Sequence, residues 1–135
     1  MGLILIVDDQ IEACRPLQLL FKHLGHRGIC VTSGEDALAY LRTKLPDLMI
    51  LDVMMPGMDG IEVLRRVRAD PSTSGVPVVM FSAVSDPGFM AHARDKGATD
   101  YWVKASMGFD QVREKVTALL PQPDGNGAAN GAAPS

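Results

Sequence analysis

The stretch ILIVDDQ, residues Ile4–Gln10, carries four aliphatic residues that run directly into two aspartates. A second stretch, LMILDVMMPG from Leu48 to Gly57, repeats this pattern, because its apolar run ends at Asp52. An isolated ionised carboxylate is very unfavourable to bury, so none of these three acids is expected inside a core. Both stretches are typical of buried strands that end where the chain meets water.

Aliphatic runs of this kind recur along the chain and alternate with helical patterns. Most of them lack the polar and apolar alternation of a half-exposed strand, which is typical of strands buried on both faces of a parallel sheet. Connections between consecutive parallel strands are nearly always right-handed. The order of elements therefore predicts an α/β fold, a doubly wound parallel sheet with helices on both faces. The expected strands are Leu3–Val7, Gly28–Thr32, Leu48–Leu51, Val76–Phe81 and Thr99–Val103.

Helix signals lie between these runs and after the last one. Asp86 followed by Pro87 is typical of a helix cap with proline at the first helical position. Pro16 is tolerated only if the first helix starts near Glu12 or Ala13. The expected apolar stripes are Leu17, Leu20, Phe21 and Leu24 in the first helix, Leu38, Leu41 and Leu45 in the second, Ile61, Leu64 and Val67 in the third, and Phe109, Val112, Val116 and Leu119 in the fifth.

The bulk composition fits one globular domain followed by a segment of different character. The chain has 135 residues, of which 47% are hydrophobic and 21% charged, and its net charge is −3. No cluster of Lys and Arg predicts a nucleic-acid surface, and no apolar stretch reaches the roughly 20 residues of a membrane span. We expect one domain over residues 1–120 and a disordered tail or linker over Pro121–Ser135, which is rich in Gly, Ala, Pro and Asn.

The two cysteines, Cys14 and Cys30, are far apart and fit no C-x-x-C spacing. Both fall within apolar patterns, so buried free thiols are expected. Met1 leads directly into a strand-like run without the basic segment of a signal peptide. A reducing cytoplasm is therefore the expected compartment.

Polar residues follow four of the five expected strands. Asp8 and Asp9 follow the first strand, Asp52 the third, Ser82 the fourth and Lys104 the fifth. Ligands of open α/β sheets bind at the carboxyl ends of the strands. Three carboxylates in one crevice repel each other unless a cation is present, and Mg²⁺ prefers such oxygen ligands. A hydroxyl and an ammonium facing a metal-bound carboxylate are suited to hold a phosphoryl group on it.

Each of these residues also has an ordinary structural explanation. An Asp at a strand end is often a turn residue, Asp9 and Glu12 can form a capping pair, and Ser82 can cap its loop. A single lysine such as Lys104 is most often a solvated charge. The matching chemistry at four strand ends favours the functional explanation.

The segments VDDQ, LDVMMPGMDG, MFSA and YWVK together resemble response regulator receiver domains, the phosphoacceptor modules of two-component signalling. That family has an acid pair after the first strand, an Asp and a Met-Pro-Gly turn after the third, a Thr or Ser after the fourth and a Lys after the fifth. The resemblance covers about residues 3–120. It implies a flavodoxin-like (βα)5 fold with five parallel strands in the order 2-1-3-4-5.

The resemblance also implies a role for each matching residue. Asp52 would be the phosphoacceptor, and Ser82 and Lys104 would contact the phosphoryl oxygens. Tyr101 and Ser82 would form a switch, in which the aromatic ring turns inward when the hydroxyl moves toward the phosphoryl group. The Mg²⁺ ligands would be Asp8, Asp9, Asp52 and the backbone carbonyl of Met54.

One residue departs from the family pattern, because Lys104 is followed by Ala105 where the family usually has proline. A cis bond before a residue other than proline costs about 2.5–4 kcal/mol, so we expect a trans bond and a rearranged loop. Ser106 is then expected to cap the last helix.

The implied function is a signalling switch that takes a phosphoryl group from a histidine kinase or histidine phosphotransfer protein, and not an enzyme for other substrates. A downstream effector or a homodimer would carry the output. One alternative is a degenerate receiver that serves as a docking module. Another is a phosphatase of the haloacid dehalogenase type, which carries D-x-D-x-T where this chain reads DDQIE from Asp8 to Glu12.

Overall fold

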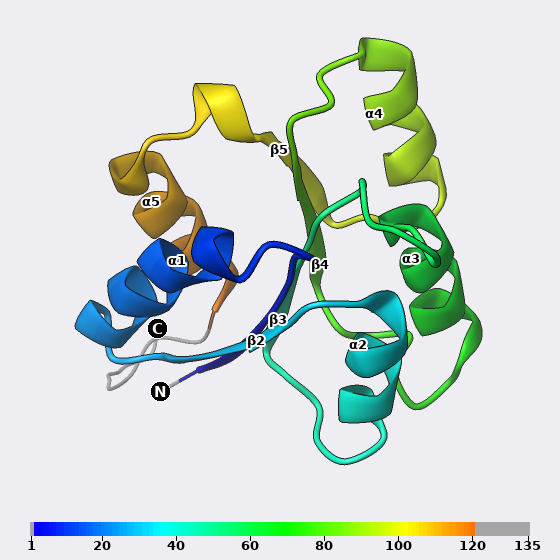
Figure 1. Ribbon diagram of the computed structural model, residues 1–135, viewed down its shortest axis with the longest axis horizontal. Helices are drawn as coiled ribbons and strands as arrows, with labels where there is room; N and C mark the ends of the chain where they lie inside the picture. Colours follow the sequence, from blue (N-terminus) through cyan, green and yellow to red (C-terminus); the bar gives the residue numbers. More distant parts are fainter. Residues whose placement is uncertain (1, 121–135) are drawn as a thin grey trace.

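The computed structural model describes residues 2–120 and shows one parallel sheet between two layers of helices (Figure 1). The strands lie in the order β2-β1-β3-β4-β5, which confirms the predicted order. All four pairings are parallel, so the carboxyl ends of the strands lie along one edge of the sheet. The strands are β1 (Leu3–Val7), β2 (Arg27–Val31), β3 (Leu48–Leu51), β4 (Val78–Ser82) and β5 (Asp100–Val103).

Helices cover both faces of the sheet, as the doubly wound fold requires. In Figure 1, α1 and α5 lie on one face, and α2, α3 and α4 lie on the other. Each face has its own hydrophobic cluster, because alternate strand residues point to opposite sides. The helices are α1 (Ile11–His23), α2 (Gly34–Leu41), α3 (Gly60–Ala69), α4 (Pro87–Asp95) and α5 (Phe109–Leu119), with a short 3-10 helix η1 (Lys104–Ser106) before the last.

Helix capping follows the sequence signals in two helices. The Asp86 carboxylate accepts a hydrogen bond from Phe89 N at 2.9 Å, and Pro87 begins α4 as predicted. The Asp59 carboxylate likewise accepts from Glu62 N at 2.9 Å at the start of α3. These caps satisfy backbone donors that have no partner inside the helix.

Three expectations about the helices were wrong. Leu45 lies beyond the end of α2 and is 51% exposed, so it does not extend the stripe of that helix. Phe109 opens α5 but is 57% exposed, because the buried side of the helix begins at Val112. Ser106 belongs to η1, and Gly108 takes the cap position instead, with its N–H bonded to Gln111 Oε1 at 3.0 Å.

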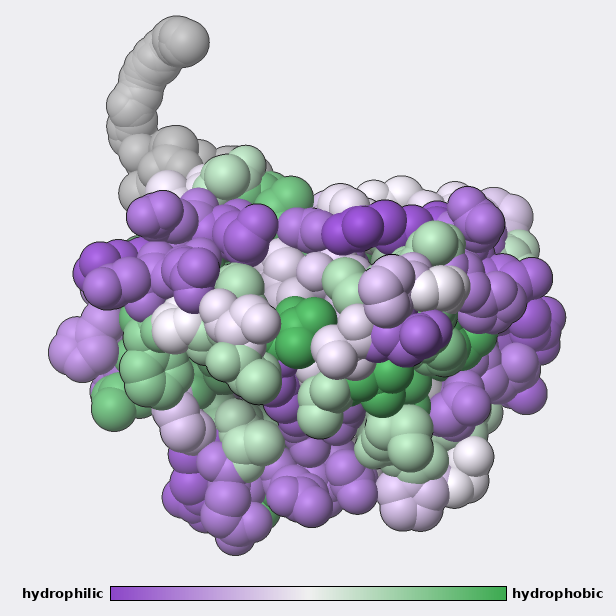
Figure 2. Space-filling view, turned by 90° about the horizontal axis from the view of Figure 1, so that it is seen from above, coloured by the Kyte–Doolittle hydropathy of each residue, from purple (hydrophilic) through white to green (hydrophobic). Residues whose placement is uncertain are grey.

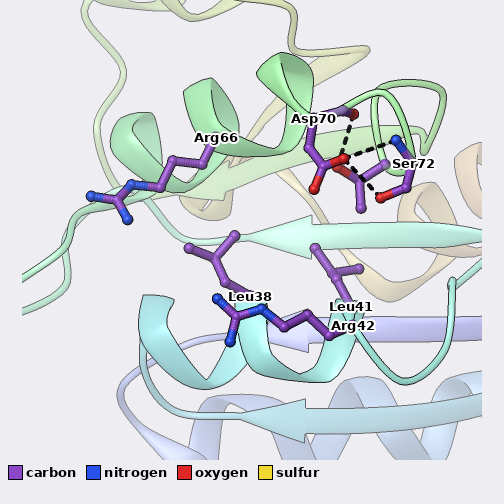
Figure 3. Close-up of a pocket in the computed structure, with 7 residues that line it drawn as sticks. Leu38, Leu41, Arg42, Arg66, Asp70 and Ser72 are labelled. Atoms are coloured by element: carbon purple, nitrogen blue, oxygen red, sulfur yellow. Dashed lines mark hydrogen bonds between the residues drawn. The ribbon is translucent and has the colours of Figure 1, made fainter.

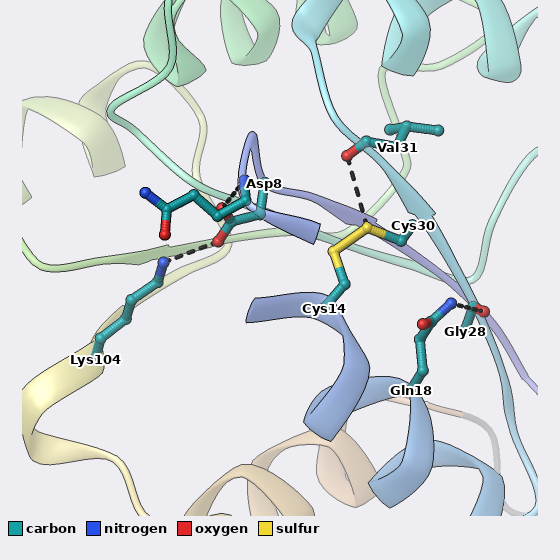
Figure 4. The surroundings of a disulfide bond; sticks show 8 residues. Asp8, Cys14, Gln18, Gly28, Cys30, Val31 and Lys104 are labelled. Carbon is teal, nitrogen blue, oxygen red and sulfur yellow. Dashed lines mark hydrogen bonds and ion pairs between the residues drawn. A yellow bond between two sulfur atoms is a disulfide. The ribbon is translucent and has the colours of Figure 1, made fainter. Parts of the chain in front are cut away.

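The expectation of two free thiols was also wrong, because Cys14 and Cys30 form a disulfide (Figure 4). Cys14 is fully buried in α1, and its Cα lies 6.0 Å from that of Cys30 on β2. Packing of α1 against β2 brings together two residues that are 16 positions apart in the chain. The bond ties the helix that follows the first acids to the edge strand of the sheet.

Within residues 2–120, every helix is too short or too polar to cross a membrane. The predicted tail, Pro121–Ser135, lies outside the residues that the structure describes.

Candidate functional site

Three carboxylates meet at the carboxyl edge of the sheet. The backbone holds them there, because Asp8 N donates to Val31 O at 3.1 Å and Asp52 N donates to Val7 O at 2.9 Å. One oxygen from each of Asp8, Asp9 and Asp52 lies within 4.8 Å of the others. Asp8 and Asp52 are buried whereas Asp9 is exposed, so the cluster, called the acid crevice below, is open to solvent on the side of Asp9. This grouping matches the arrangement expected from the sequence.

Figure 2 looks down on this edge and shows hydrophobic side chains among polar ones at its centre. Two apolar residues that follow the acids in the chain are exposed, because Met54 is 66% exposed and Ile11 46% exposed. Met54 follows the acid on β3, and its N–H lies 3.4 Å from Asp52 Oδ1. The crevice of acids therefore has apolar neighbours at the surface.

Lys104 reaches the acids from the end of β5. Its Nζ donates to Asp8 Oδ2 at 2.9 Å (Figure 4). The same Nζ lies 3.5 Å from Asp52 Oδ2. The Lys104–Ala105 pair begins η1, so this loop is a tight turn directly after the strand. The sequence prediction that Lys104 faces the acids is therefore matched in space.

Electrostatics at the acids favour a cation. Burial raises the pKa of Asp52 above its ordinary value of 3.8; Lys104 opposes this shift and the charge of Asp8 adds to it. Burial would lower the pKa of Lys104, but the hydrogen bond to Asp8 and the two carboxylate charges raise it overall. Two buried carboxylates thus share one ammonium, and Asp9 adds a third carboxylate to the cluster. Hard oxygen donors with excess negative charge fit Mg²⁺.

Ser82 and Tyr101 lie behind the acids on β4 and β5. Ser82 is fully buried, and its hydroxyl accepts a hydrogen bond from Val84 N at 3.2 Å. The Tyr101 hydroxyl donates to Val84 O at 2.7 Å, and the ring is only 4% exposed. Burial raises the pKa of the Tyr101 phenol above its ordinary value. The ring is therefore in an inward position and is tied to the loop that follows Ser82.

The Met-Pro-Gly turn after Asp52 has a steric reason for its glycines. Gly57 has a positive φ of 73°, a backbone conformation that residues with a side chain rarely adopt. Gly60 begins α3 against the preceding strand, and a Cβ there would collide with the carbonyl oxygen of Asp52. The turn thus lets α3 start directly behind the acid.

Sequence reasoning missed one residue at this site, Phe81. Its ring lies beneath the Lys104 ammonium, with 5.6 Å between Nζ and the ring centroid. Only the pairing of β4 with β5, which sets Phe81 opposite Trp102, brings it there. The signal available in the sequence was an aromatic residue directly before Ser82.

A separate cavity of about 180 Å³ lies between α2 and α3 (Figure 3). The Asp70 carboxylate at its edge accepts hydrogen bonds from Ser72 N at 2.9 Å and from Ser72 Oγ at 2.8 Å. Those hydrogen bonds lower the pKa of Asp70 and engage its carboxylate. This cavity shares no lining residue with the acid crevice.

Comparison with known proteins places this geometry in a family. Residues 4–117 match the family model described as response regulator receiver domain. The chain is 39% identical over 105 residues to the transcriptional regulatory protein AfsQ1 of Streptomyces coelicolor, covering 78% of this chain and 45% of that protein. It is 40% identical over 101 residues to the DNA-binding response regulator MtrA of Mycobacterium tuberculosis, covering 75% of this chain and 43% of that protein. The chain thus spans less than half the length of these relatives.

Solved structures agree with the sequence matches. The chemotaxis protein CheY4 of Vibrio cholerae has a TM-score of 0.82 and 26% identity, with 89% of this chain and 99% of that chain covered. The signal receiver domain of a signal transduction histidine kinase from Syntrophus aciditrophicus has a TM-score of 0.81 and 31% identity, with 89% and 90% covered. With the family model matching most of its length, this chain belongs to the response regulator receiver domain family.

Proposed function

We propose that Asp52 accepts a phosphoryl group from the phosphohistidine of a histidine kinase or a histidine phosphotransfer protein, in a Mg²⁺-dependent reaction. The observation that carries this proposal is the convergence of Asp8, Asp9, Asp52 and Lys104 at one sheet edge in a family of receiver domains.

Each side chain has a role that its position supports. A carboxylate oxygen of Asp52 attacks phosphorus while the bond from phosphorus to the donor's imidazole nitrogen breaks, and that nitrogen keeps the electron pair. Lys104 and the Ser82 hydroxyl would contact the phosphoryl oxygens, which would lower the energy of the charge that spreads over them. Asp8, Asp9, Asp52 and the backbone carbonyl of Met54 would hold Mg²⁺, which would supply charge neutralisation at the transferring group.

The contacts of Lys104 would shift toward Asp52 during this reaction. Its ammonium now bonds Asp8 at 2.9 Å and lies farther from Asp52, at 3.5 Å. A phosphoryl oxygen on Asp52 would compete with Asp8 for the hydrogens of the ammonium. A cation held by the acids would partly neutralise the charge of Asp8 and so weaken its attraction for Lys104.

Ser82 and Tyr101 are proposed to transmit the change. Both side chains bond to the backbone of Val84. The Ser82 hydroxyl accepts a hydrogen bond from the Val84 N–H, and the Tyr101 hydroxyl donates one to the Val84 carbonyl oxygen. Movement of the Ser82 hydroxyl toward a phosphoryl oxygen breaks its bond to Val84 N. The loop between β4 and α4, and the Tyr101 ring bonded to it, would then take a different arrangement.

The direct test is labelling with acetyl phosphate and Mg²⁺, read by intact mass and by release of the phosphate with hydroxylamine, which cleaves acyl phosphates and leaves phosphate esters intact. We expect one phosphoryl group on the unchanged chain and none on Asp52→Asn. Asp110→Asn is the matched control, because its exposed carboxylate on α5 lies outside the acid cluster. Equal labelling of Asp52→Asn would refute the assignment.

The same experiment separates the two other functions. Continuous release of phosphate with a short-lived acyl phosphate would indicate a phosphatase. Absence of labelling despite Mg²⁺ binding would indicate a docking module. Asp9→Ala should weaken Mg²⁺ binding, because it removes a hard oxygen ligand.

The output and the location of the protein stay predictions. AfsQ1 is named a transcriptional regulatory protein and MtrA a DNA-binding response regulator. We propose that this domain itself binds no nucleic acid and no membrane, and that an effector or a homodimer reads its phosphorylated state. The cytoplasm, where histidine kinases would supply the phosphoryl group, is the proposed compartment.

A further inference from the structure

The Lys104 ammonium has three hydrogens and three neighbouring groups. Two sides face oxygens of Asp8 and Asp52, at 2.9 and 3.5 Å. A third side faces the ring of Phe81, 5.6 Å from its centroid. That distance lies within the roughly 6 Å over which an aromatic face attracts a cation.

The Phe81 ring packs against Trp102 of the neighbouring strand. Phe81 pairs with Trp102 across β4 and β5, and the two rings meet edge to face with centroids 6.2 Å apart. Trp102 is 2% exposed, and its Nε1 donates to Asp100 Oδ2 at 2.9 Å. A chain of contacts thus runs from the start of β5 up to the ring.

Lys104 itself has less support from the backbone. It lies just after the last residue of β5 and begins η1, a turn of three residues. The paired residues of the two strands end at Ser82 and Val103, one position before it. The direction of its side chain therefore depends on what the side chain touches.

We infer that Phe81 is a positioning residue for Lys104, holding the ammonium over the acid crevice with the face of its ring. This inference rests on the proposed phosphoacceptor function. An aromatic face attracts the cation without supplying a lone pair that competes with phosphoryl oxygen for the hydrogens. It also keeps water from that side of the ammonium. The ring thus limits the ammonium to positions near Asp8 and Asp52.

Nuclear magnetic resonance tests the contact without metal or phosphodonor. Ring current from Phe81 should shift the ε-methylene protons of Lys104 upfield relative to those of Lys22, which is exposed on α1. Phe81→Leu should return them to the position of an exposed lysine, and Phe81→Tyr should keep the shift. An unshifted Lys104 signal in the unchanged chain would overturn the inference.

Labelling kinetics test the role of that contact. Phe81→Leu should slow acetyl phosphate labelling roughly two- to thirtyfold, the range that cation–π energies convert to. Mg²⁺ affinity should not fall, because the three carboxylates remain in place and the ammonium that competes for Asp8 is held less closely. Phe81→Tyr should recover most of the rate, which a role in filling space alone would not require.

Phe21→Leu is the matched control. Phe21 is fully buried in the same hydrophobic cluster but lies on α1, so its loss tests the effect of a weakened core. We expect this variant to be less stable and to label at the unchanged rate. A Phe81→Leu rate equal to that of the unchanged chain would overturn the positioning role. An unchanged chain that accepts no phosphoryl group would overturn the proposed function, and the positioning role with it.

Discussion

The Lys104 ammonium and the Asp8 carboxylate form an ion pair of 2.9 Å between residues 96 positions apart in the chain. Asp8 is 8% exposed at its side chain, and Lys104 is 31% exposed. The carboxylate that Mg²⁺ is proposed to need is thus already bonded to a cation of the protein. We therefore expect the lysine and the metal to compete for this carboxylate.

Lys104→Met should therefore strengthen Mg²⁺ binding while it weakens phosphorylation. Removing one positive charge about 4 Å from the site changes the interaction by about 1 kcal/mol in water and more in a partly buried crevice, so we expect about tenfold tighter binding. Isothermal titration with Mg²⁺ measures it. Lys115→Met is the control, because it removes the same charge beside Asp100. Weaker Mg²⁺ binding in Lys104→Met would contradict the competition.

The phosphoryl group on Asp52 should be long-lived. Met54 and Val84 lie near the acid and the hydroxyl, and neither side chain can orient a water by hydrogen bonding. Met54 is 66% exposed, so its replacement should leave the core intact. Met54→Gln should speed spontaneous dephosphorylation several-fold. Loss of phosphate within seconds from the unchanged chain would show that the attacking water does not need to be oriented by a polar side chain at these two positions.

Arg68 is expected to be a major contributor to stability. Its Nε donates to Gly97 O at 2.8 Å, and its Nη1 donates to Ser74 O at 3.0 Å and Val76 O at 2.6 Å. Hydrogen bonds from charged groups contribute about 1.5–3 kcal/mol each, and such losses are not additive. Arg68→Ala should lower the free energy of unfolding by about 2–4 kcal/mol in urea.

Arg68→Lys should recover only part of this loss, because an ammonium cannot fork between these acceptors. Arg65→Ala is the control on the same helix, since Arg65 pairs with Glu62 at the surface. A urea curve for Arg68→Ala that overlays that of Arg65→Ala would show that the carbonyls find other partners.

Stability should fall as pH drops below about 6.5 because of His26. Burial lowers the pKa of His26 from its ordinary value of 6.5, and the charge of Asp47 opposes this shift. His26 Nδ1 accepts a hydrogen bond from Gly2 N at 2.9 Å, which the neutral ring alone can do. The unfolded chain therefore binds a proton more readily, and protonation favours unfolding.

Thermal melts between pH 5 and pH 8 measure this effect. His26→Gln should flatten the profile in that window, because its amide oxygen accepts a hydrogen bond at every pH. His92→Gln is the control, since His92 is exposed on α4. A profile that keeps its slope in His26→Gln would assign the slope to another group.

Reduction of the Cys14–Cys30 disulfide should lower the free energy of unfolding. The bridge joins residues 16 positions apart, and a loop of about 15 residues corresponds to about 3 kcal/mol in the chain-entropy account. Unfolding with and without dithiothreitol measures the difference. A double Cys→Ala variant should not respond to the reductant. Alkylation of both cysteines in the native, unreduced chain would show that the bond is absent.

The positions of the acids were predictable because the end of each strand can be recognised from neighbouring residues in the sequence. Aliphatic runs ending at Asp8 and Asp52 required only the rule that parallel strands share their carboxyl edge. The cap at Asp86 was equally local, since its partner Phe89 N lies three residues away. Local sequence patterns thus identify the strand ends and the helix cap, and the parallel topology explains why the acids share one edge of the sheet.

Contacts between distant segments were not predictable from the pattern. The disulfide required the packing of α1 on β2, because apolar periodicity makes Cys14 and Cys30 look like ordinary core residues. Phe81 reaches Lys104 only through the register of β4 against β5. Phe109 fits the helical stripe of α5, yet it lies at the first turn, where the helix has not reached the core.

The distance along the chain between Asp8 and Lys104 has a consequence for biosynthesis. Contacts between remote segments form late, since closing a long loop has to precede them. A nascent chain released only as far as β4 holds the acids but not the lysine. On the proposed function, the ability to accept a phosphoryl group therefore requires the last strand, and an incomplete or misfolded copy would not be phosphorylated.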